Sequence, residues 1–195
     1  MSRKEIVAIY GMNNIGKTAV LKGVVEKLGN GAVCLKYPIY DTPTGRRINA
    51  YLRGGNPEGL DALAVQNIFA QNRVDFEPEL IRMSEKGMVI LEDYNGTGKV
   101  WGMLGAEATI EQMEVINAGQ LEPDLNILLD GERFGTGIES NHKHEGIVQE
   151  GWDKGRMIHL DLAKRYGWKV VGVRFGELDR EIEEVTNLII NGKRK

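Results

Sequence analysis

The residues best suited to chemistry lie near the start of the chain, in the segment Gly11-Met12-Asn13-Asn14-Ile15-Gly16-Lys17-Thr18. Its spacing fits the pattern G-x-x-x-x-G-K-[ST]. Glycines let the backbone wrap closely around a phosphate, the lysine meets the outer phosphates, and the threonine hydroxyl reaches a magnesium ion. The segment therefore predicts a phosphate-binding loop, with Lys17 and Thr18 as its main polar side chains.

The elements that flank this loop support the same interpretation. The apolar run Ile6-Val7-Ala8-Ile9 precedes it, and an amphipathic segment from Ala19 to Leu28 follows it. A helix that starts at the loop directs its partly positive N-terminus toward the bound phosphate. A chance glycine turn is the alternative, and the strand-then-helix context disfavours it. We therefore expect a nucleotide to bind here.

The rest of the chain alternates apolar runs with helical patterns. We expect strands at residues 5–10, 32–37, 88–91, 125–130 and 168–175. We expect helices at residues 17–28, 43–53, 58–76, 78–86, 100–118, 147–166 and 178–190. Because the strands are apolar throughout and separated by helices, they predict an α/β fold whose five-stranded parallel sheet is covered on both faces. Ligands of such sheets bind beyond the carboxyl ends of the strands, where residues 11–18, 92–97 and 130–145 would gather.

Composition limits the class of protein. The chain has 195 residues, which is most simply one domain, and its net charge of −3 gives no reason to expect nucleic acid or an anionic membrane as a partner. The lone Cys34 cannot form an internal disulfide, and its apolar neighbours predict a buried thiol. No apolar run reaches the length of a membrane span and no signal-peptide core is present, so we expect a cytoplasmic protein.

Five further blocks occur in a fixed order along the chain. They are Lys36-Tyr37-Pro38 with residues 42–48, Phe69-Ala70-Gln71-Asn72-Arg73, Glu92-Asp93-Tyr94-Asn95-Gly96-Thr97, Glu122-Pro123-Asp124-Leu125 with Leu129-Asp130, and His142-Lys143-His144-Glu145. In this order, and together with the loop, the blocks resemble thymidylate kinases, a family of P-loop nucleoside monophosphate kinases. The resemblance extends over nearly the whole chain.

The resemblance implies a three-layer P-loop kinase fold in one domain, residues 1–195, with a short lid at about residues 131–146. It implies phosphoryl transfer from ATP to a deoxynucleoside monophosphate, with dTMP as the leading candidate, and Mg²⁺ as the cofactor. A homodimer packed through its helices is also implied.

The resemblance also implies roles for individual side chains. Residues 11–18 would bind ATP, with Lys17 bridging the donor phosphates, while Thr18 and Glu92 would hold the metal. Glu92 could alternatively act in catalysis by accepting a proton or a hydrogen bond from the acceptor. Phe69 would stack on the pyrimidine and Arg73 would grip the acceptor's phosphate with its planar fork. The remaining substrate contacts would be Asn13, Tyr94 and Thr97, and the lid cations would be Arg133 and Lys143.

Several of these residues have structural alternatives. Phe69 has the helical spacing of a core residue, and Arg73 stands near Asp75 and Glu77, with which it could form a surface ion pair of little energetic value. Tyr94 could close a strand end, and Lys143 could be a solvated loop residue. A zinc site from His142 and His144 is disfavoured, since no cysteine or third histidine stands nearby.

Four positions depart from the family's pattern. Asn13 replaces a carboxylate that holds the sugar hydroxyl, Asn14 replaces an arginine or glycine, and Tyr40 stands where an arginine is common. Asp93 replaces the arginine of D-R-Y and so reverses a charge. We expect Asp93 to turn away from the site or to pair with Arg46, Arg47 or Arg73.

Two other function classes remain open. The lost arginines favour a deoxynucleoside kinase of similar fold, whose acceptor carries no phosphate. They also fit a non-catalytic nucleotide-binding relative. A GTPase switch is disfavoured, because residues 141–144 do not supply the guanine-reading N-K-x-D motif.

Overall fold

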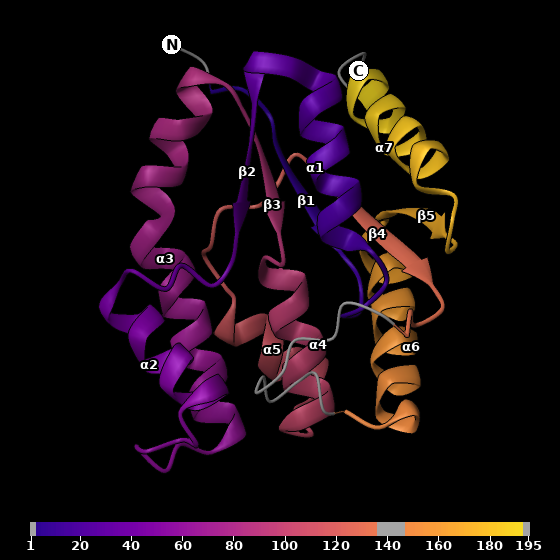
Figure 1. Ribbon diagram of the computed structural model, residues 1–195. Coiled ribbons are helices and arrows are strands. Elements are labelled where there is room, and N and C mark those ends of the chain that lie inside the picture. The colour runs from indigo at the N-terminus through magenta and orange to yellow at the C-terminus, as the bar shows by residue number, and fades with distance from the viewer. Residues whose placement is uncertain (1–2, 136–146, 193–195) are drawn as a thin grey trace.

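The computed structural model describes residues 3–135 and 147–192, and a five-stranded parallel sheet forms its centre (Figure 1). The strands are β1 (Ile6–Tyr10), β2 (Ala32–Lys36), β3 (Met88–Glu92), β4 (Leu125–Gly131) and β5 (Lys169–Val173), in the spatial order β2-β3-β1-β4-β5. The helices are α1 (Lys17–Leu28), α2 (Pro43–Arg53), α3 (Ala62–Lys86), α4 (Asn95–Gly105), α5 (Ile110–Ile116), α6 (Gln149–Tyr166) and α7 (Leu178–Gly192), with a short 3-10 turn at Gly29–Gly31. The predicted α/β fold and its five parallel strands are confirmed.

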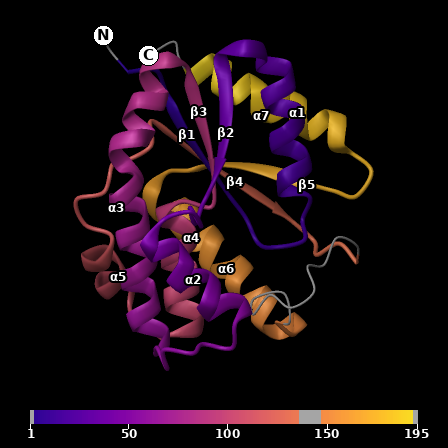
Figure 2. The same cartoon turned by 60° about the vertical axis from the view of Figure 1, so that its left-hand side comes forward.

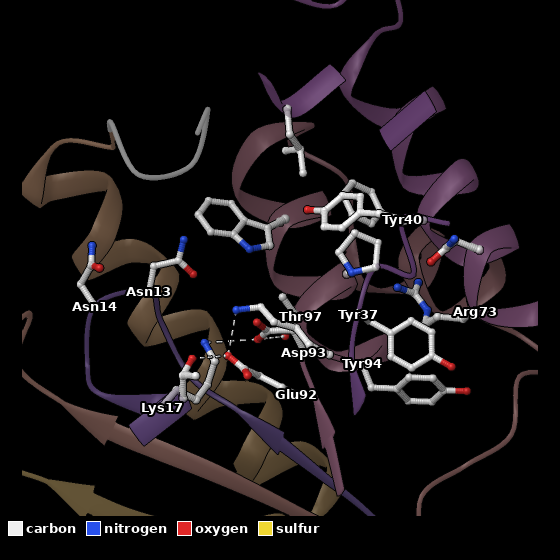
Figure 3. A pocket seen from close by; sticks show the side chains of 18 of the residues that line it. Asn13, Asn14, Lys17, Tyr37, Tyr40, Arg73, Glu92, Asp93, Tyr94 and Thr97 are labelled. Carbon is white, nitrogen blue, oxygen red and sulfur yellow. Dashed lines mark hydrogen bonds and ion pairs between the residues drawn. The ribbon is translucent and has the colours of Figure 1, made fainter. Parts of the chain in front are cut away.

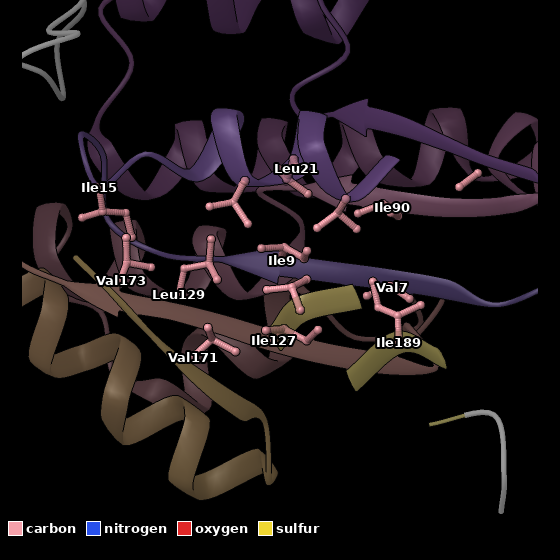
Figure 4. Packing of buried hydrophobic residues seen from close by; sticks show 14 of the residues in the cluster. Val7, Ile9, Ile15, Leu21, Ile90, Ile127, Leu129, Val171, Val173 and Ile189 are labelled. Atoms are coloured by element: carbon pink, nitrogen blue, oxygen red, sulfur yellow. The ribbon is translucent and has the colours of Figure 1, made fainter. Parts of the chain in front are cut away.

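Helices cover both faces of the sheet (Figures 1 and 2). On one face Val7 and Ile9 of β1 pack with Leu21 of α1 and Ile189 of α7, in the cluster that Figure 4 shows. On the other face Ile6 and Ala8 pack with residues of α3 and α6. Because alternate side chains of a strand point to opposite faces, an entirely apolar strand such as β1 contributes to both clusters.

The strand order brings three loops to one edge of the sheet. Strand β1 lies between β3 and β4, with Ile9 opposite Glu92 and Tyr10 opposite Leu128. The segments that leave these three strands are therefore neighbours, as the sequence predicts. The helix pair α2 and α3 stands beside them and forms a small apolar cluster of its own around Ile48 and Val65.

Two helix predictions are wrong. Helix α3 begins at Ala62, capped by Asp61, and continues to Lys86 with Pro78 inside it. A proline removes one backbone hydrogen bond and disfavours a helix, but buried side chains on both sides of Pro78, among them Arg73 and Leu80, hold this helix in place. The predicted helix at 100–118 is two helices, because the capping box of Thr109 and Gln112 starts α5 separately from α4.

The prediction of a buried thiol is also wrong. Cys34 is exposed, because β2 is an edge strand of the sheet and part of it faces solvent.

Within residues 3–135 and 147–192, no helix combines the length and the apolar character needed to span a membrane.

Candidate active site

A cavity of about 610 Å³ opens at the carboxyl edge of the sheet. This volume is in the range of small-molecule sites in proteins. Its lining comes from the loop and the start of α1 (Asn13, Asn14 and residues 16–19), from the end of β2 and the segment after it (residues 36–38 and Tyr40), and from α2 (Leu52 and Arg53). It is completed by α3 (Gln66, Phe69, Asn72 and Arg73), by the end of β3 and the two residues after it (residues 92–94), by α4 (Thr97, Gly98 and Trp101), and by Phe134. Figure 3 shows the side chains that surround it.

The first loop has the backbone of a phosphate cradle. Gly11 has φ 149°, and a Cβ there would lie 2.7 Å from the carbonyl oxygen of Leu129, so only glycine fits. Gly16 has φ 84° at the start of α1, again a conformation that favours glycine. The indole N–H of Trp152 donates to the carbonyl of Asn13 at 3.0 Å and anchors the loop from α6. The loop is therefore shaped before any ligand arrives.

Lys17 is buried at the floor of the cavity. Its ammonium donates to the carbonyl of Gly11 at 3.0 Å and lies 3.3 Å from the Asp93 carboxylate. The side chain is only 7% exposed, so its charge is poorly screened by water. Lys17 thus supplies a positive charge within the loop where phosphates would bind.

Asp93 faces this lysine, which corrects the sequence prediction. Of the three arginines expected to pair with it, Arg47 donates to Glu58, and Arg73 donates to two amides. Asp93 has φ 63°, an unusual left-handed conformation that Asp tolerates better than most residues. Its carboxylate also accepts from the Thr97 hydroxyl at 3.1 Å. Thr97 therefore lines the cavity while its hydroxyl positions Asp93.

Thr18 and Glu92 lie together, as a metal site requires. The Thr18 hydroxyl donates to Glu92 Oε1 at 2.9 Å, and Lys36 Nζ donates to the same oxygen at 3.0 Å. A carboxylate and a hydroxyl suit Mg²⁺, which takes most of its other ligands from water and substrate phosphates. The described residues contain no cluster of three or more His, Cys, Asp or Glu that could hold a metal by itself. These two oxygens therefore fit a magnesium ion that is shared with a nucleotide.

Arg73 is not a surface ion pair. It is 2% exposed, and its guanidinium donates to Gln120 Oε1 at 2.8 Å and to Asn117 Oδ1 at 2.7 Å. Burial lowers its pKa to about 10, so the group is still a cation at neutral pH. Figure 3 places Arg73 across the cavity from Lys17, beside Tyr37 and Tyr94. Both hydrogen-bond partners of Arg73 are neutral, which leaves its positive charge available to the cavity.

The two tyrosines close the deep end of the cavity. Tyr37 and Tyr94 are buried, with ring centroids 5.1 Å apart. Phe69, one turn of α3 before Arg73, is half-buried against the small cluster of α2 and α3, and it also lines the cavity. Phe69 therefore packs in a core cluster, as one of its two interpretations from sequence holds, and its stacking on a pyrimidine stays a prediction.

Asn72 positions the segment after β2. Its amide nitrogen donates to the carbonyl of Ile39 and to the Thr42 hydroxyl, while its oxygen accepts from the backbone N–H of Ile39. Tyr40 follows, and Arg53 donates to its hydroxyl at 2.9 Å. The Tyr40–Arg53 pair at the cavity wall puts a guanidinium close to the position where the family's pattern places an arginine.

Of the segment predicted as a lid, residues 131–146, the structure describes only residues 131–135. Phe134 lines the cavity, and its N–H donates to the carbonyl of Asn14. Arg133 donates to the carbonyl of Ile147 and is not among the residues that line the cavity. Lys143 lies outside the described residues.

Sequence reasoning gave no role in the site to several residues of the cavity, among them Lys36, Arg53, Gln66, Trp101 and Phe134. Gln66 carried a usable signal, because it precedes Phe69 and Arg73 at helical spacing and so shares their face of α3. Lys36 carried another, as a cation at the end of a predicted strand. Arg53, Trp101 and Phe134 could be assigned to the cavity only from the three-dimensional arrangement of the helices and strands.

Comparison with known proteins agrees with this geometry. The sequence model of the family described as thymidylate kinase matches residues 9–147. The thymidylate kinase of African swine fever virus is 23% identical over 131 residues, which cover 66% of this chain and 52% of the viral protein. The chain therefore spans about half the length of this curated relative.

Two solved structures share the fold. The thymidylate kinase of Candida albicans superposes with a TM-score of 0.86 at 19% identity, covering 99% of this chain and 94% of that one. The enzyme from Ehrlichia chaffeensis gives a TM-score of 0.73 at 17% identity, covering 97% of this chain and 99% of that one. With its phosphate-binding loop, its sheet order and the family match over most of its length, this chain belongs to the thymidylate kinase family.

Proposed function

We propose that this protein transfers the γ-phosphoryl group of ATP to dTMP and releases dTDP and ADP. One observation carries the proposal: Lys17 of the phosphate-binding loop and Arg73 of α3 line the same cavity from opposite sides (Figure 3). A donor and an acceptor can therefore be held at once and face each other. Positioning of this kind supplies most of the catalysis in phosphoryl transfer.

The donor half consists of residues 11–18. Backbone N–H groups of the loop and the ammonium of Lys17 bind the ATP phosphates, and Thr18 with Glu92 holds Mg²⁺. The metal neutralises charge on the donor phosphates when it is bound. Lys17 exchanges its contact with Asp93 for one with a phosphate oxygen as ATP enters.

The acceptor half lies along α3. Phe69 stacks on the pyrimidine, as an aromatic wall of the cavity can. Arg73 is buried beside Tyr37 and Tyr94, across the cavity from Lys17, so we assign it to the base end of the acceptor in place of the phosphate contact that the sequence resemblance implied. Tyr40 and Arg53 stand on the wall after β2, where they can meet the acceptor phosphate. We assign the sugar to Tyr94 and Asn13.

A second acceptor is favoured by one specific observation. Asp93 brings a carboxylate into the cavity next to Glu92, and a carboxylate repels an acceptor phosphate but accepts a hydrogen bond from a neutral 5′-hydroxyl. Thymidine is therefore the second candidate acceptor, in a transfer that would yield dTMP.

A turnover screen tests both candidates. ADP release is measured with dTMP, thymidine and the other deoxynucleoside monophosphates, in the presence of Mg²⁺. We expect dTMP to give the highest kcat/KM. Activity on thymidine without activity on dTMP would replace the first candidate with the second, and ATP binding without turnover on any acceptor would indicate a non-catalytic relative.

We further propose a homodimer and a catalytic cation delivered by the lid, either Arg133 or Lys143. Sedimentation equilibrium checks the first of these. For the second, Arg133→Met and Lys143→Met are compared, and the variant with the larger fall in kcat identifies the cation.

A further inference from the structure

Lys36 is the last residue of β2 and belongs to neither the phosphate-binding loop nor the lid. Its side chain is 60% exposed, yet the ammonium reaches into the cavity and meets Glu92, whose side chain is only 4% exposed. An exposed cation therefore contacts a buried carboxylate.

The contact falls on the oxygen that a metal would use. Glu92 Oε1 accepts from Thr18 Oγ1 at 2.9 Å and from Lys36 Nζ at 3.0 Å, so one oxygen serves both donors. Mg²⁺ binds oxygen at about 2.0–2.1 Å, so an ion on Glu92 Oε1 would lie within about 5 Å of the ammonium. Two cations this close repel strongly in a partly buried site. The ion pair of Lys36 and the binding of a metal therefore compete for Glu92.

The charges at this end of the cavity show why Lys36 is needed once the metal is bound. Among the residues that the structure describes, the charged side chains that line the cavity beside the loop are Lys17, Lys36, Glu92 and Asp93, two of each sign. Asn14 is neutral where the family's pattern has arginine or glycine, and Asp93 is negative where the pattern has arginine. Transfer of a phosphoryl group brings further negative charge to this place, and a lysine on a flexible four-carbon stem can follow it.

We infer that Lys36 is a further catalytic residue with two positions: it holds Glu92 Oε1 while the metal is absent, and it moves onto the phosphates when Mg²⁺ takes that oxygen. This inference rests on the proposed function for its second half. Its first half concerns the chain alone and is testable without turnover.

The test compares Lys36→Met, which keeps most of the stem and removes the charge, with Lys36→Arg, which keeps the charge. Mn²⁺ is titrated into the nucleotide-free protein and followed by electron paramagnetic resonance. We expect Lys36→Met to bind Mn²⁺ about fivefold more tightly than the wild type or better, because Glu92 is freed. Lys22→Met on the exposed side of α1 is the matched control and should leave the affinity unchanged.

The second readout is turnover with the best acceptor from the screen. We expect kcat to fall roughly 100-fold in Lys36→Met and to be largely rescued in Lys36→Arg. Thermal melts confirm that each variant is folded. Unchanged or weaker Mn²⁺ binding in Lys36→Met would overturn the first half, and unchanged kcat would overturn the second. A wild-type protein that turns over no acceptor would instead refute the proposed function, while the Mn²⁺ result would still stand.

Discussion

The ammonium of Lys17 lies 3.3 Å from the carboxylate of Asp93, so the lysine of the phosphate-binding loop is paired within the protein. ATP phosphates must compete with this carboxylate for the same charge. The carboxylate also repels the phosphates directly. Asp93 is therefore expected to weaken the donor site while it holds Lys17 in place.

Replacing Asp93 with asparagine should tighten ATP binding. The amide keeps a hydrogen-bonding side chain that tolerates the left-handed backbone, but it removes the negative charge. We expect the Kd for ATP to fall roughly tenfold, equivalent to about 1.4 kcal/mol. Isothermal titration calorimetry measures it, with Asp75→Asn on the outer side of α3 as the control; weaker binding by Asp93→Asn would refute this account of the pair.

Replacing Asp93 with alanine should destabilise the protein more than asparagine does. At φ 63° a residue whose side chain makes no local hydrogen bond is strained, at a cost of roughly 1–2 kcal/mol. Alanine also loses the hydrogen bond that the Thr97 hydroxyl donates to Asp93. Chemical denaturation of the two variants gives the difference in unfolding free energy. Equal stabilities would mean that the backbone at this position is not strained.

Replacing Phe69 should weaken the binding of the acceptor and leave the binding of ATP unchanged. An aromatic face under a base is worth about 1–3 kcal/mol, so we expect Phe69→Ala to raise the KM for dTMP by roughly 5- to 150-fold. The KM for ATP should hardly change. Phe76→Leu, on the same helix but packed edge-on against Tyr37, controls for loss of an aromatic side chain from α3. An unchanged KM for dTMP in Phe69→Ala would remove this residue from the acceptor site.

His159 should make the folded state sensitive to acid. Its ring is buried in α6, Nδ1 donates to the carbonyl of Gly155, and burial lowers its pKa to about 4 from the ordinary 6.5. Between pH 6.5 and about 4 the unfolded chain binds a proton that the folded chain does not. Stability therefore falls as the pH falls through this window, by roughly 3 kcal/mol at pH 4.

The variant His159→Asn keeps a donor near the position of Nδ1 but does not titrate. Its unfolding free energy should depend less on pH between 6.5 and 4 than that of the wild type, as urea denaturation at several pH values will measure. Parallel pH profiles for the two proteins would show that His159 does not cause the acid sensitivity.

Local sequence signals explain which parts of the fold could be predicted. The uniformly apolar strands identified the sheet, Pro43 was expected to begin a helix and does begin α2, and the glycines at 11 and 16 marked the loop. Helix α3 could not be predicted as one piece, because packing on both sides of Pro78 overrides a local rule.

Which residues contact each other within the site could be determined only from the three-dimensional structure. Lys36 meets Glu92 because β2 and β3 pair in a register that sets these two residues side by side. Arg73 meets Asn117 and Gln120, which lie more than forty residues further along the chain. Such contacts depend on strand order and helix placement, which local patterns do not carry.

The most direct test of the proposed activity is to identify the product. The protein is incubated with ATP, Mg²⁺ and dTMP, and phosphorus NMR follows the nucleotides, with Lys17→Met as the matched inactive control. We expect the paired signals of dTDP and ADP to grow together in the wild type and to be absent in the variant. If dTMP stays unchanged under conditions in which ATP binds, the protein is not a dTMP kinase.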